Sequence, residues 1–239
     1  MAQDIWIGIE ASEDGAQGWR FAGTRELATA KGSSVADITA QLGEGLVLVV
    51  SAGQSSQPAP AAALADRLPL ADLTQHKPRG LLCAVARLRI AGVLHQRPNW
   101  DGIICLPVAG VTHWCQISAN EIVSFQSALT PRLAQSLNAA DTADPEAVAD
   151  TMSRPERLAL HLRSATLAGS AKAVAGHLLG AELAAMRPYW LGQQVISVTR
   201  NSLYSGALGL QGVPVETVDP EDAARLGLIA LHVKHHQTL

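Results

Sequence analysis

The sequence predicts an α/β or α+β protein, and three observations lead to that prediction. Hydrophobic residues make up 48% of the 239 residues and charged residues only 16%, so the chain can bury one large core or two smaller ones. Aromatic residues make up 4%, so Leu, Val, Ile and Ala must fill the core. Strand-like patterns fill the first half of the chain, whereas helix-start signals dominate the second half.

Charge and cysteine content argue against several function classes. The formal net charge is −3 and no dense Lys/Arg cluster occurs, so neither a nucleic acid nor an anionic membrane is an expected partner. The three cysteines, Cys83, Cys105 and Cys115, are odd in number and lack C-x-x-C spacing, which argues against a disulfide framework or a structural zinc site. A reducing, cytoplasmic location is therefore expected. The first residues show no basic leader followed by an apolar run, so no signal peptide is expected.

The first hundred residues read mostly as strands and loops. Ile5, Ile7 and Ile9 alternate on one face of a strand, and an acidic loop at 11–16 joins it to a second strand at 17–22. Strand, polar loop and strand together predict a hairpin. Further patterns predict a short helix, a continuously apolar and therefore buried strand, and a second helix, at residues 35–42, 46–51 and 61–67.

Helix starts in the second half are marked by a cap residue before a proline or an acidic first turn. These signals are Thr130-Pro131, Asp144-Pro145, Ser153 with Glu156, and Asp219-Pro220. A further helix at 171–186 has its apolar residues on one stripe, and Gly176 and Gly180 would let another backbone approach closely. The remaining patterns predict a strand, a helix and a strand, at 195–198, 202–210 and 213–218.

The stretch from Ile103 to Thr130 reads as three strands and a helix start. A turn with Gly110 follows the first strand, and a polar turn at 118–121 separates the other two. Because glycine permits close approach, the first turn could point backbone N–H groups at an anion, with Thr112 and His113 at its mouth. The alternative is an ordinary hairpin corner with a structural glycine. The sequence leaves both open, since no complete phosphate-loop signature is present.

The histidines offer no clear metal site. His232, His235 and His236 could gather a transition metal, but near the C-terminus they are expected to be solvated. His161 and His177 fall on predicted helices, where ordinary core or surface histidines are expected. The sequence therefore predicts no metal ligands among these residues.

Six segments, taken in order, carry a family resemblance. They are the strand at 5–9, GVTHW at 110–114, IVSFQSALT at 122–130, HLLGAELA at 177–184, VISV at 195–198 and DAARLGLIA at 222–230. Over nearly its whole length the chain resembles the 2-keto-3-deoxygalactonate kinases. The most specific matches are Gly110 to Trp114 and Gly180 to Glu182, where the family has G-T-H-S-K-W and L-I-G-A-E.

This resemblance implies an α/β fold of two ribonuclease-H-like lobes, as in the sugar kinase, heat-shock protein and actin superfamily. ATP would lie in the central cleft of such a fold. The first lobe is expected to cover residues 1–106 and the second residues 107–239, with the final helix packing back on the first lobe.

The departures from the family pattern fall on its functional segments. The Asp-Trp-Gly-Thr-Thr loop, which would hold phosphate and magnesium, is replaced by Glu10-Ala11-Ser12-Glu13-Asp14, whose two added carboxylates would repel a triphosphate. The substrate loop M-A-G-M-V-G-S is reduced to SAGQSS at 51–56, and only Arg89 matches the R-G-E-E segment. Two further segments have changed, T-G-E to Thr130-Pro131-Arg132 and the adenosine-side glycine turn to Thr199-Arg200-Asn201.

Site residues follow from the resemblance, position by position. The candidate cofactor-binding residues are Glu10, Ser12, Gly110 and Thr112. The candidate substrate-binding residues are Gly53, Arg89 and His113. No catalytic residue is assigned.

Two functions stay open. The first is an active kinase that uses ATP and magnesium to phosphorylate a keto-deoxy sugar acid. The second is an inactive kinase homologue that binds such a sugar acid as a regulatory or sensing protein, without a cofactor. Phosphoryl transfer depends on positioning and charge neutralisation, so the lost phosphate glycines and acidic pair favour the second. In both cases the expected partner is a small-molecule sugar acid, and a homodimer is left open.

Overall fold

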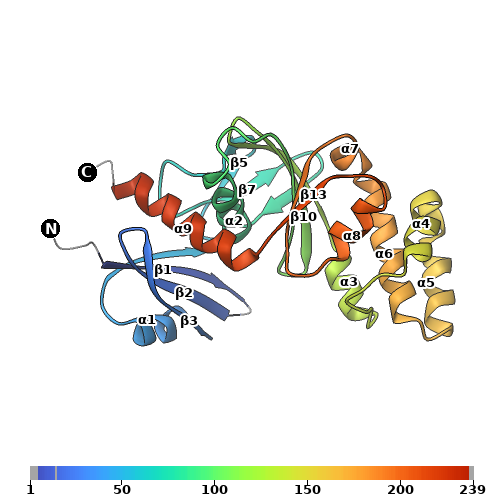
Figure 1. Cartoon of the computed structure of the whole chain (residues 1–239), viewed down its shortest axis with the longest axis horizontal. Coiled ribbons are helices and arrows are strands. Elements are labelled where there is room, and N and C mark those ends of the chain that lie inside the picture. Colours follow the sequence, from blue (N-terminus) through green and yellow to red (C-terminus); the bar gives the residue numbers. More distant parts are fainter. Residues whose placement is uncertain (1–4, 14, 237–239) are drawn as a thin grey trace. The chain divides into compact units, whose positions relative to one another are not determined.

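The structure, a computed structural model, describes residues 5–13 and 15–236 (Figure 1). It divides into two compact units whose segments alternate along the chain. Unit 1 comprises Met1–Trp100, Ile117–Ser124 and Asp219–Leu239, and unit 2 comprises Asp101–Gln116 and Phe125–Val218. None of the helices in the described part of the chain is both long and apolar enough to span a membrane.

Unit 1 begins with a four-stranded sheet of order β3-β2-β1-β4. Its strands are β1 (Ile5–Ser12), β2 (Gly15–Ala22), β3 (Arg25–Gly32) and β4 (Leu46–Ser51). The central strand β1 pairs antiparallel with β2 and parallel with β4. Because side chains alternate along a strand, Ile7 and Ile9 pack against α1 (Val35–Leu42), whereas Trp6 belongs to a separate core. The predicted first strand, hairpin and short helix are confirmed.

Two helices from distant parts of the sequence pack with Trp6 in that second core: α2 (Ala84–His95) and α9 (Pro220–His236). They meet at glycines. A Cβ atom on Gly92 would lie 1.8 Å from the carbonyl oxygen of Ala223, and one on Gly227 would lie 2.2 Å from the carbonyl oxygen of Leu88. The two backbones therefore touch at positions where no side chain fits.

A small sheet of order β5-β7-β8 precedes α2. Its strands are β5 (Ser56–Pro58), β7 (Asp72–Gln75) and β8 (Gly80–Leu82), and β6 (Ala61–Ala62) lies between the first two in sequence. The helix predicted at 61–67 is wrong. The carbonyls of Ala62 and Ala63 accept hydrogen bonds from the buried guanidinium of Arg87, so an interaction from outside the segment replaces helical bonding there.

The sheet of unit 2 contains the three strands predicted around Gly110. The strand order is β13-β12-β9-β10-β11-β6. Besides β6, the strands are β9 (Gly102–Val108), β10 (Val111–Ser118), β11 (Glu121–Ala128), β12 (Val195–Val198) and β13 (Val215–Val218). β12 pairs parallel with both β9 and β13. The β10–β11 tip at 117–124 belongs to unit 1, where Glu121 and Ile122 pair with β6. The predicted pattern of strand, turn, two strands and helix start is confirmed.

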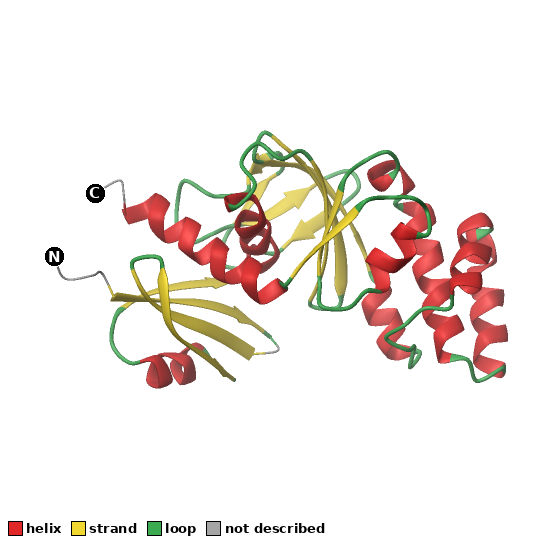
Figure 2. Cartoon of the chain, in the orientation of Figure 1, coloured by secondary structure: helices red, strands yellow, loops and turns green. Residues whose placement is uncertain are grey.

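Helices make up most of the remainder of unit 2. They are α3 (Thr130–Ser136), α4 (Pro145–Ser153), the short 3-10 helix η1 (Pro155–Arg157), α5 (Leu158–Leu167), α6 (Ala171–Ala185), α7 (Arg187–Trp190) and α8 (Leu203–Gly209). Figure 2 shows α4, α5 and α6 lying side by side. A Cβ atom on Gly176 would lie 2.6 Å from the carbonyl oxygen of Asp144, and one on Gly180 would lie 2.5 Å from that of Val148. The predicted close approach at these glycines is confirmed.

Three predictions are wrong in detail. β4 was predicted to be buried, but it is an edge strand on which Leu46 is 51% exposed. Ser153 was predicted to start a helix, but it is the last residue of α4. His232 was predicted to be solvated, but it is buried and stacks on Trp6 at a ring-centroid distance of 3.9 Å, because α9 continues to His236. The patterns also gave no sign of β3, α2, β7 or β8.

Candidate functional site

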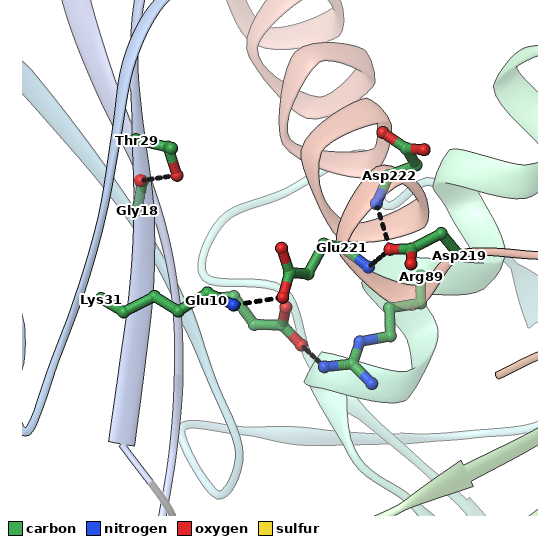
Figure 3. Close-up of polar contacts among 8 residues, drawn as sticks. All are labelled: Glu10, Gly18, Thr29, Lys31, Arg89, Asp219, Glu221 and Asp222. Carbon is green, nitrogen blue, oxygen red and sulfur yellow. Dashed lines mark hydrogen bonds and ion pairs between the residues drawn. The ribbon is translucent and has the colours of Figure 1, made fainter. Parts of the chain in front are cut away.

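The end of β1 carries an ion pair within unit 1 (Figure 3). The Nη2 atom of Arg89, on α2, lies 2.7 Å from Oε1 of Glu10, on β1. Glu10 is only 6% exposed and Arg89 is half-buried. The structure thus brings together a predicted cofactor-binding residue and a predicted substrate-binding residue.

Further charged side chains lie around this pair. Burial raises the pKa of Glu10, the Arg89 guanidinium opposes that shift, and the neighbouring charge of Glu221 raises the pKa further. Glu221 in turn forms an ion pair with Lys31 of β3. At the start of α9, the Asp219 carboxylate accepts the backbone N–H of Glu221 at 2.7 Å, which fixes this first turn. Figure 3 shows the two ion pairs, Glu10 with Arg89 and Glu221 with Lys31, beside the carboxylates of Asp219 and Asp222.

Magnesium does not fit this arrangement. Glu10 has a guanidinium as its counter-cation, and a metal ion at the same oxygen would meet that positive charge. Magnesium also needs several oxygen ligands in near-octahedral geometry. Among residues 5–13 and 15–236, no group of three His, Cys, Asp or Glu side chains is placed to hold a metal ion.

The segment after β1 is a tight hairpin turn. Ser12 pairs with Gly15 in the β1–β2 register, and its exposed hydroxyl donates to the Gly15 carbonyl at 3.3 Å. Glu13 is exposed beside it. Asp14, the second added carboxylate, lies outside the described residues. The hydroxyl of the predicted phosphate residue Ser12 is thus engaged within the turn itself.

Gly53 is held by a buried carboxylate that sequence reasoning missed. Its φ of +79° is one that glycine adopts readily, and its N–H donates to Oδ2 of Asp72 at 3.0 Å. The other oxygen of Asp72 accepts the N–H of Ala84 at 2.7 Å, at the first residue of α2. Asp72 therefore ties the segment around Gly53 to the helix that carries Arg89. The only sign of this role in the sequence was that Asp72 is an isolated acidic residue next to apolar neighbours in a loop-like region.

In unit 2, Ala109 and Gly110 form the turn between β9 and β10. Their φ values are +50° and +76°, as expected for the two central residues of a type I′ hairpin turn. A Cβ atom on Gly110 would lie 3.4 Å from Nε of Arg132, so this guanidinium lies over the turn. The geometry is that of the hairpin corner, and the anion-binding role of the turn stays a prediction.

Thr112 and His113 are buried rather than at an open mouth. Thr112 is fully buried, and its hydroxyl lies 2.6 Å from the Tyr204 hydroxyl. His113 is 4% exposed, and its Nδ1 lies 2.8 Å from Oγ of Ser127. Burial lowers the pKa of His113 to about 4, so the ring is neutral at pH 7. Both residues belong to β10, which lies inside the sheet between β9 and β11, and their predicted binding roles stay a prediction.

A second polar network surrounds Glu182 of α6. Its carboxylate accepts hydrogen bonds from Nε1 of Trp114 at 2.7 Å and from the hydroxyl of Tyr204 at 3.1 Å. Burial raises the pKa of Glu182, while the hydrogen bonds from Thr130, Trp114 and Tyr204 oppose that shift. Thr130 and Tyr204 also line a cavity of about 440 Å³, which Asn201 borders as well. The sequence pointed to Glu182 through its family motif but gave no sign of Tyr204.

The predicted site residues fall into two groups. Glu10, Ser12, Gly53 and Arg89 lie in unit 1. Gly110, Thr112 and His113 lie on one hairpin of unit 2. Within each group the residues share neighbouring segments, and no role in binding is established for any of them by their placement alone.

Solved structures of other proteins have a fold similar to that of this chain. A candidate 2-dehydro-3-deoxygalactonokinase from Sinorhizobium meliloti superposes with a TM-score of 0.81 at 18% identity, over 95% of this chain and 98% of that one. The activator of 2-hydroxyisocaproyl-CoA dehydratase from Clostridium difficile, solved with bound ADPNP, superposes with a TM-score of 0.57 at 12% identity, over 98% of this chain and 97% of that one. Component A of (R)-2-hydroxyglutaryl-CoA dehydratase from Acidaminococcus fermentans gives a TM-score of 0.52 at 12% identity, over 99% of this chain and 100% of that one.

These likenesses confirm the predicted α/β fold of the actin and sugar kinase type. A search among curated proteins found no match to the sequence. A sequence model of one family, 2-keto-3-deoxy-galactonokinase, matches residues 86–231, which is more than half of the chain. The chain belongs to the 2-keto-3-deoxy-galactonokinase family.

Proposed function

We propose that this protein binds a keto-deoxy sugar acid and does not transfer phosphate to it. Family membership supports the class of ligand, because the family is named for a kinase of such an acid. The observation that carries the loss of transfer is the Glu10–Arg89 ion pair at the end of β1. In this proposal the protein senses or regulates through the ligand that its relatives phosphorylate.

The chemistry of phosphoryl transfer supports this reading. The reaction depends on cations that neutralise the charge of the transferred group and on donors that position it. Here Arg89 forms an ion pair with Glu10, the carboxylate that would hold magnesium. The exposed carboxylate of Glu13 follows in the turn. Thr112, the hydroxyl expected near the phosphates, is buried against Tyr204. Each of these features lowers the expected affinity for a metal–triphosphate complex.

An active kinase is the second candidate, and the cavity of about 440 Å³ in unit 2 favours it. Small-molecule sites begin at about 300 Å³, so the cavity is large enough for a nucleoside. The Clostridium difficile protein of the same fold was solved with bound ADPNP, an analogue of ATP. In this alternative, ATP would bind in the cavity of unit 2 that Asn201 and Tyr204 line.

Titration calorimetry on the full chain separates the two candidates. We expect 2-keto-3-deoxygalactonate to bind and magnesium-ATP to give no saturable heat at millimolar concentration. Saturable magnesium-ATP binding would favour the kinase. Absence of binding by the sugar acid would overturn the proposed ligand class.

A further inference from the structure

We infer that β4 of unit 1 is an interaction surface and that its partner is the β4 strand of a second copy of this chain. β4 ends one side of the sheet β3-β2-β1-β4, and within the residues that the structure describes it pairs with β1 alone. One row of its backbone N–H and C=O groups therefore faces away from the sheet, where another strand can add to it. This inference concerns assembly and does not depend on the sugar acid.

The side chains of β4 leave this edge open to pairing. The strand reads LVLVVS, which has no charge and no proline and is rich in valine, a residue favoured in strands. Leu46 is 51% exposed and Val47 is 39% exposed, on opposite faces of the strand. The residues on either side of the strand, Gly45 and Ala52, are small and exposed, so they do not obstruct an approaching strand.

The opposite edge of the same sheet, β3, is protected against pairing. It carries the charged residues Arg25, Glu26 and Lys31. The last two form ion pairs with Arg225 and Glu221 of α9, respectively. The register between β2 and β3 also shifts, as at a β-bulge, whereas β4 pairs with β1 in continuous register. Charged side chains and bulges are common means of preventing pairing at a sheet edge, so β4 is the edge where pairing is expected.

Symmetry favours a second copy of the chain as the partner. Two identical strands can pair antiparallel about a two-fold axis, and this arrangement gives a closed dimer. Pairing of β4 with the β3 edge of another copy would instead continue from copy to copy without closing. The charges and the bulge of β3 oppose that second arrangement.

The charge pattern agrees with pairing between identical strands. Near a two-fold axis each residue lies close to its own counterpart, so a charged strand would bring like charges together. In β4 only Leu, Val and Ser side chains would meet across the axis. The nearest charged residue is Glu44, two positions before the strand. Antiparallel pairing about the centre of β4 places the two copies of Glu44 at opposite ends of the contact.

The expected dimer is weak. Six residues of strand span only about 20 Å, so this contact alone buries less than the roughly 800 Å² per partner of a standard interface. Further contact surface lies beside the start of β4, in a hollow of about 700 Å³. Residues of α1 and of the turn after it line this hollow: Ala36, Thr39, Ala40, Gly43, Glu44 and Gly45. We therefore expect a dissociation constant in the micromolar range.

Sedimentation equilibrium of the full chain tests the inference. The unmodified chain should pass from the mass of one chain to that of two as its concentration rises through the micromolar range. Val47→Lys places a positive charge at an exposed position of the edge in each copy, and we expect it to raise the dissociation constant about tenfold or more. Val47→Glu should have the same effect. An equimolar mixture of the two variants should recover the dimer, because a lysine then faces a glutamate.

The matched control is Leu27→Lys, which also places a lysine at a half-buried leucine or valine of an edge strand. Leu27 is 44% exposed on β3, and we expect its replacement to leave the dissociation constant within about twofold of that of the unmodified chain. Urea unfolding of each variant checks that the fold is retained. If Val47→Lys and Val47→Glu prove unstable, Leu46→Lys and Leu46→Glu replace them at a more exposed side chain.

Three outcomes overturn the inference. A chain that stays monomeric throughout the micromolar range does not pair at β4. A dimer whose dissociation constant is unchanged by Val47→Lys has its interface elsewhere. A mass that rises steadily beyond two chains indicates open pairing between different edges. Loss of the dimer in each charged variant, with recovery in their mixture and no effect of Leu27→Lys, supports pairing of β4 with its counterpart, because misfolding cannot produce recovery on mixing.

Discussion

At the end of β1, burial disfavours the charge of the Glu10 carboxylate and the Arg89 guanidinium restores it. Removing one partner of such a pair costs more than the pair itself contributes, because the other charge stays buried without compensation. At the scale of single residues, the stability of this site therefore depends on how tightly Glu10 and Arg89 are coupled.

We expect Arg89→Met to lower the free energy of unfolding by about 3 kcal/mol at pH 7, since it leaves Glu10 buried and uncompensated. Urea unfolding measures this. The double variant Glu10→Gln with Arg89→Met should recover most of the loss, because no buried charge remains. Losses that simply add in the double variant would show that the two residues are not coupled.

His113 gives a pH prediction of defined sign. Its pKa falls from 6.5 to about 4 on folding, so the folded state favours the neutral ring. The stability contributed by His113 is therefore fully present above pH 6.5 and is lost as the pH falls toward 4. The loss amounts to about 3 kcal/mol if the whole shift is realised.

The measurement for His113 is the free energy of unfolding at pH 7 and at pH 4.5. His113→Gln carries no titrating group, so the difference between variant and unmodified chain should shrink at the lower pH. Glu10, whose pKa is raised, acts in the opposite direction in the range above 4.5, and the comparison of the two chains removes its contribution. An equal pH dependence for both chains would refute the assignment.

At the scale of elements, glycines set the closest helix contacts. Gly176 and Gly180 lie four apart on α6, so their shared face was visible in the sequence. Gly92 and Gly227 make an even closer contact, but they lie on α2 and α9, which are far apart along the chain. No local pattern links two such glycines, so their contact could not be predicted.

Gly180→Ala should destabilise the protein by about 2 kcal/mol. The new Cβ would meet the Val148 carbonyl at 2.5 Å, and the strain exceeds the gain in helix propensity of about 1 kcal/mol. Gly206→Ala in α8 is the matched control, because nothing lies within 4 Å of its Cβ position. It should stabilise the protein by about 0.5–1 kcal/mol in thermal or urea unfolding. Equal effects of the two substitutions would contradict the packing described for α6.

The elements that sequence reasoning found are those with local causes. The cap at Asp144 and the alternation of Ile7 and Ile9 can be recognised from residues that are close together in the sequence. The failures have distant causes: Arg87 organises residues 62 and 63, and the edge position of β4 exposes a strand whose composition indicated burial. The same limit applies to the site, where motif matching located Glu10 and Arg89 but not the contact between them.

At the scale of the whole molecule, proteins of low sequence identity share this fold. The S. meliloti structure superposes on nearly the full length of this chain at 18% identity, which shows how much sequence change this fold tolerates. Fold persistence does not require that the chemistry persist, because function depends on specific side chains.

The turn after β1 supplies a test at this scale. Magnesium-ATP should leave the melting temperature of the unmodified chain unchanged, because a ligand stabilises only through its affinity for the folded state. Replacing Glu13 by Gly and Asp14 by Thr removes two like charges from the sequence of that turn. We expect magnesium-ATP to raise the melting temperature of the double variant without any turnover, because Arg89 is still ion-paired with Glu10. Failure to gain a shift would show that the turn alone does not prevent nucleotide binding.

The most direct measurement is a coupled assay of ADP formation with the full chain, magnesium-ATP and 2-keto-3-deoxygalactonate, run beside calorimetry with the sugar acid alone. We predict that the sugar acid binds and that ADP forms no faster with the sugar acid than without it. Formation of ADP that depends on the sugar acid, with one phosphorylated sugar acid made for each ADP, would contradict it and establish an active kinase.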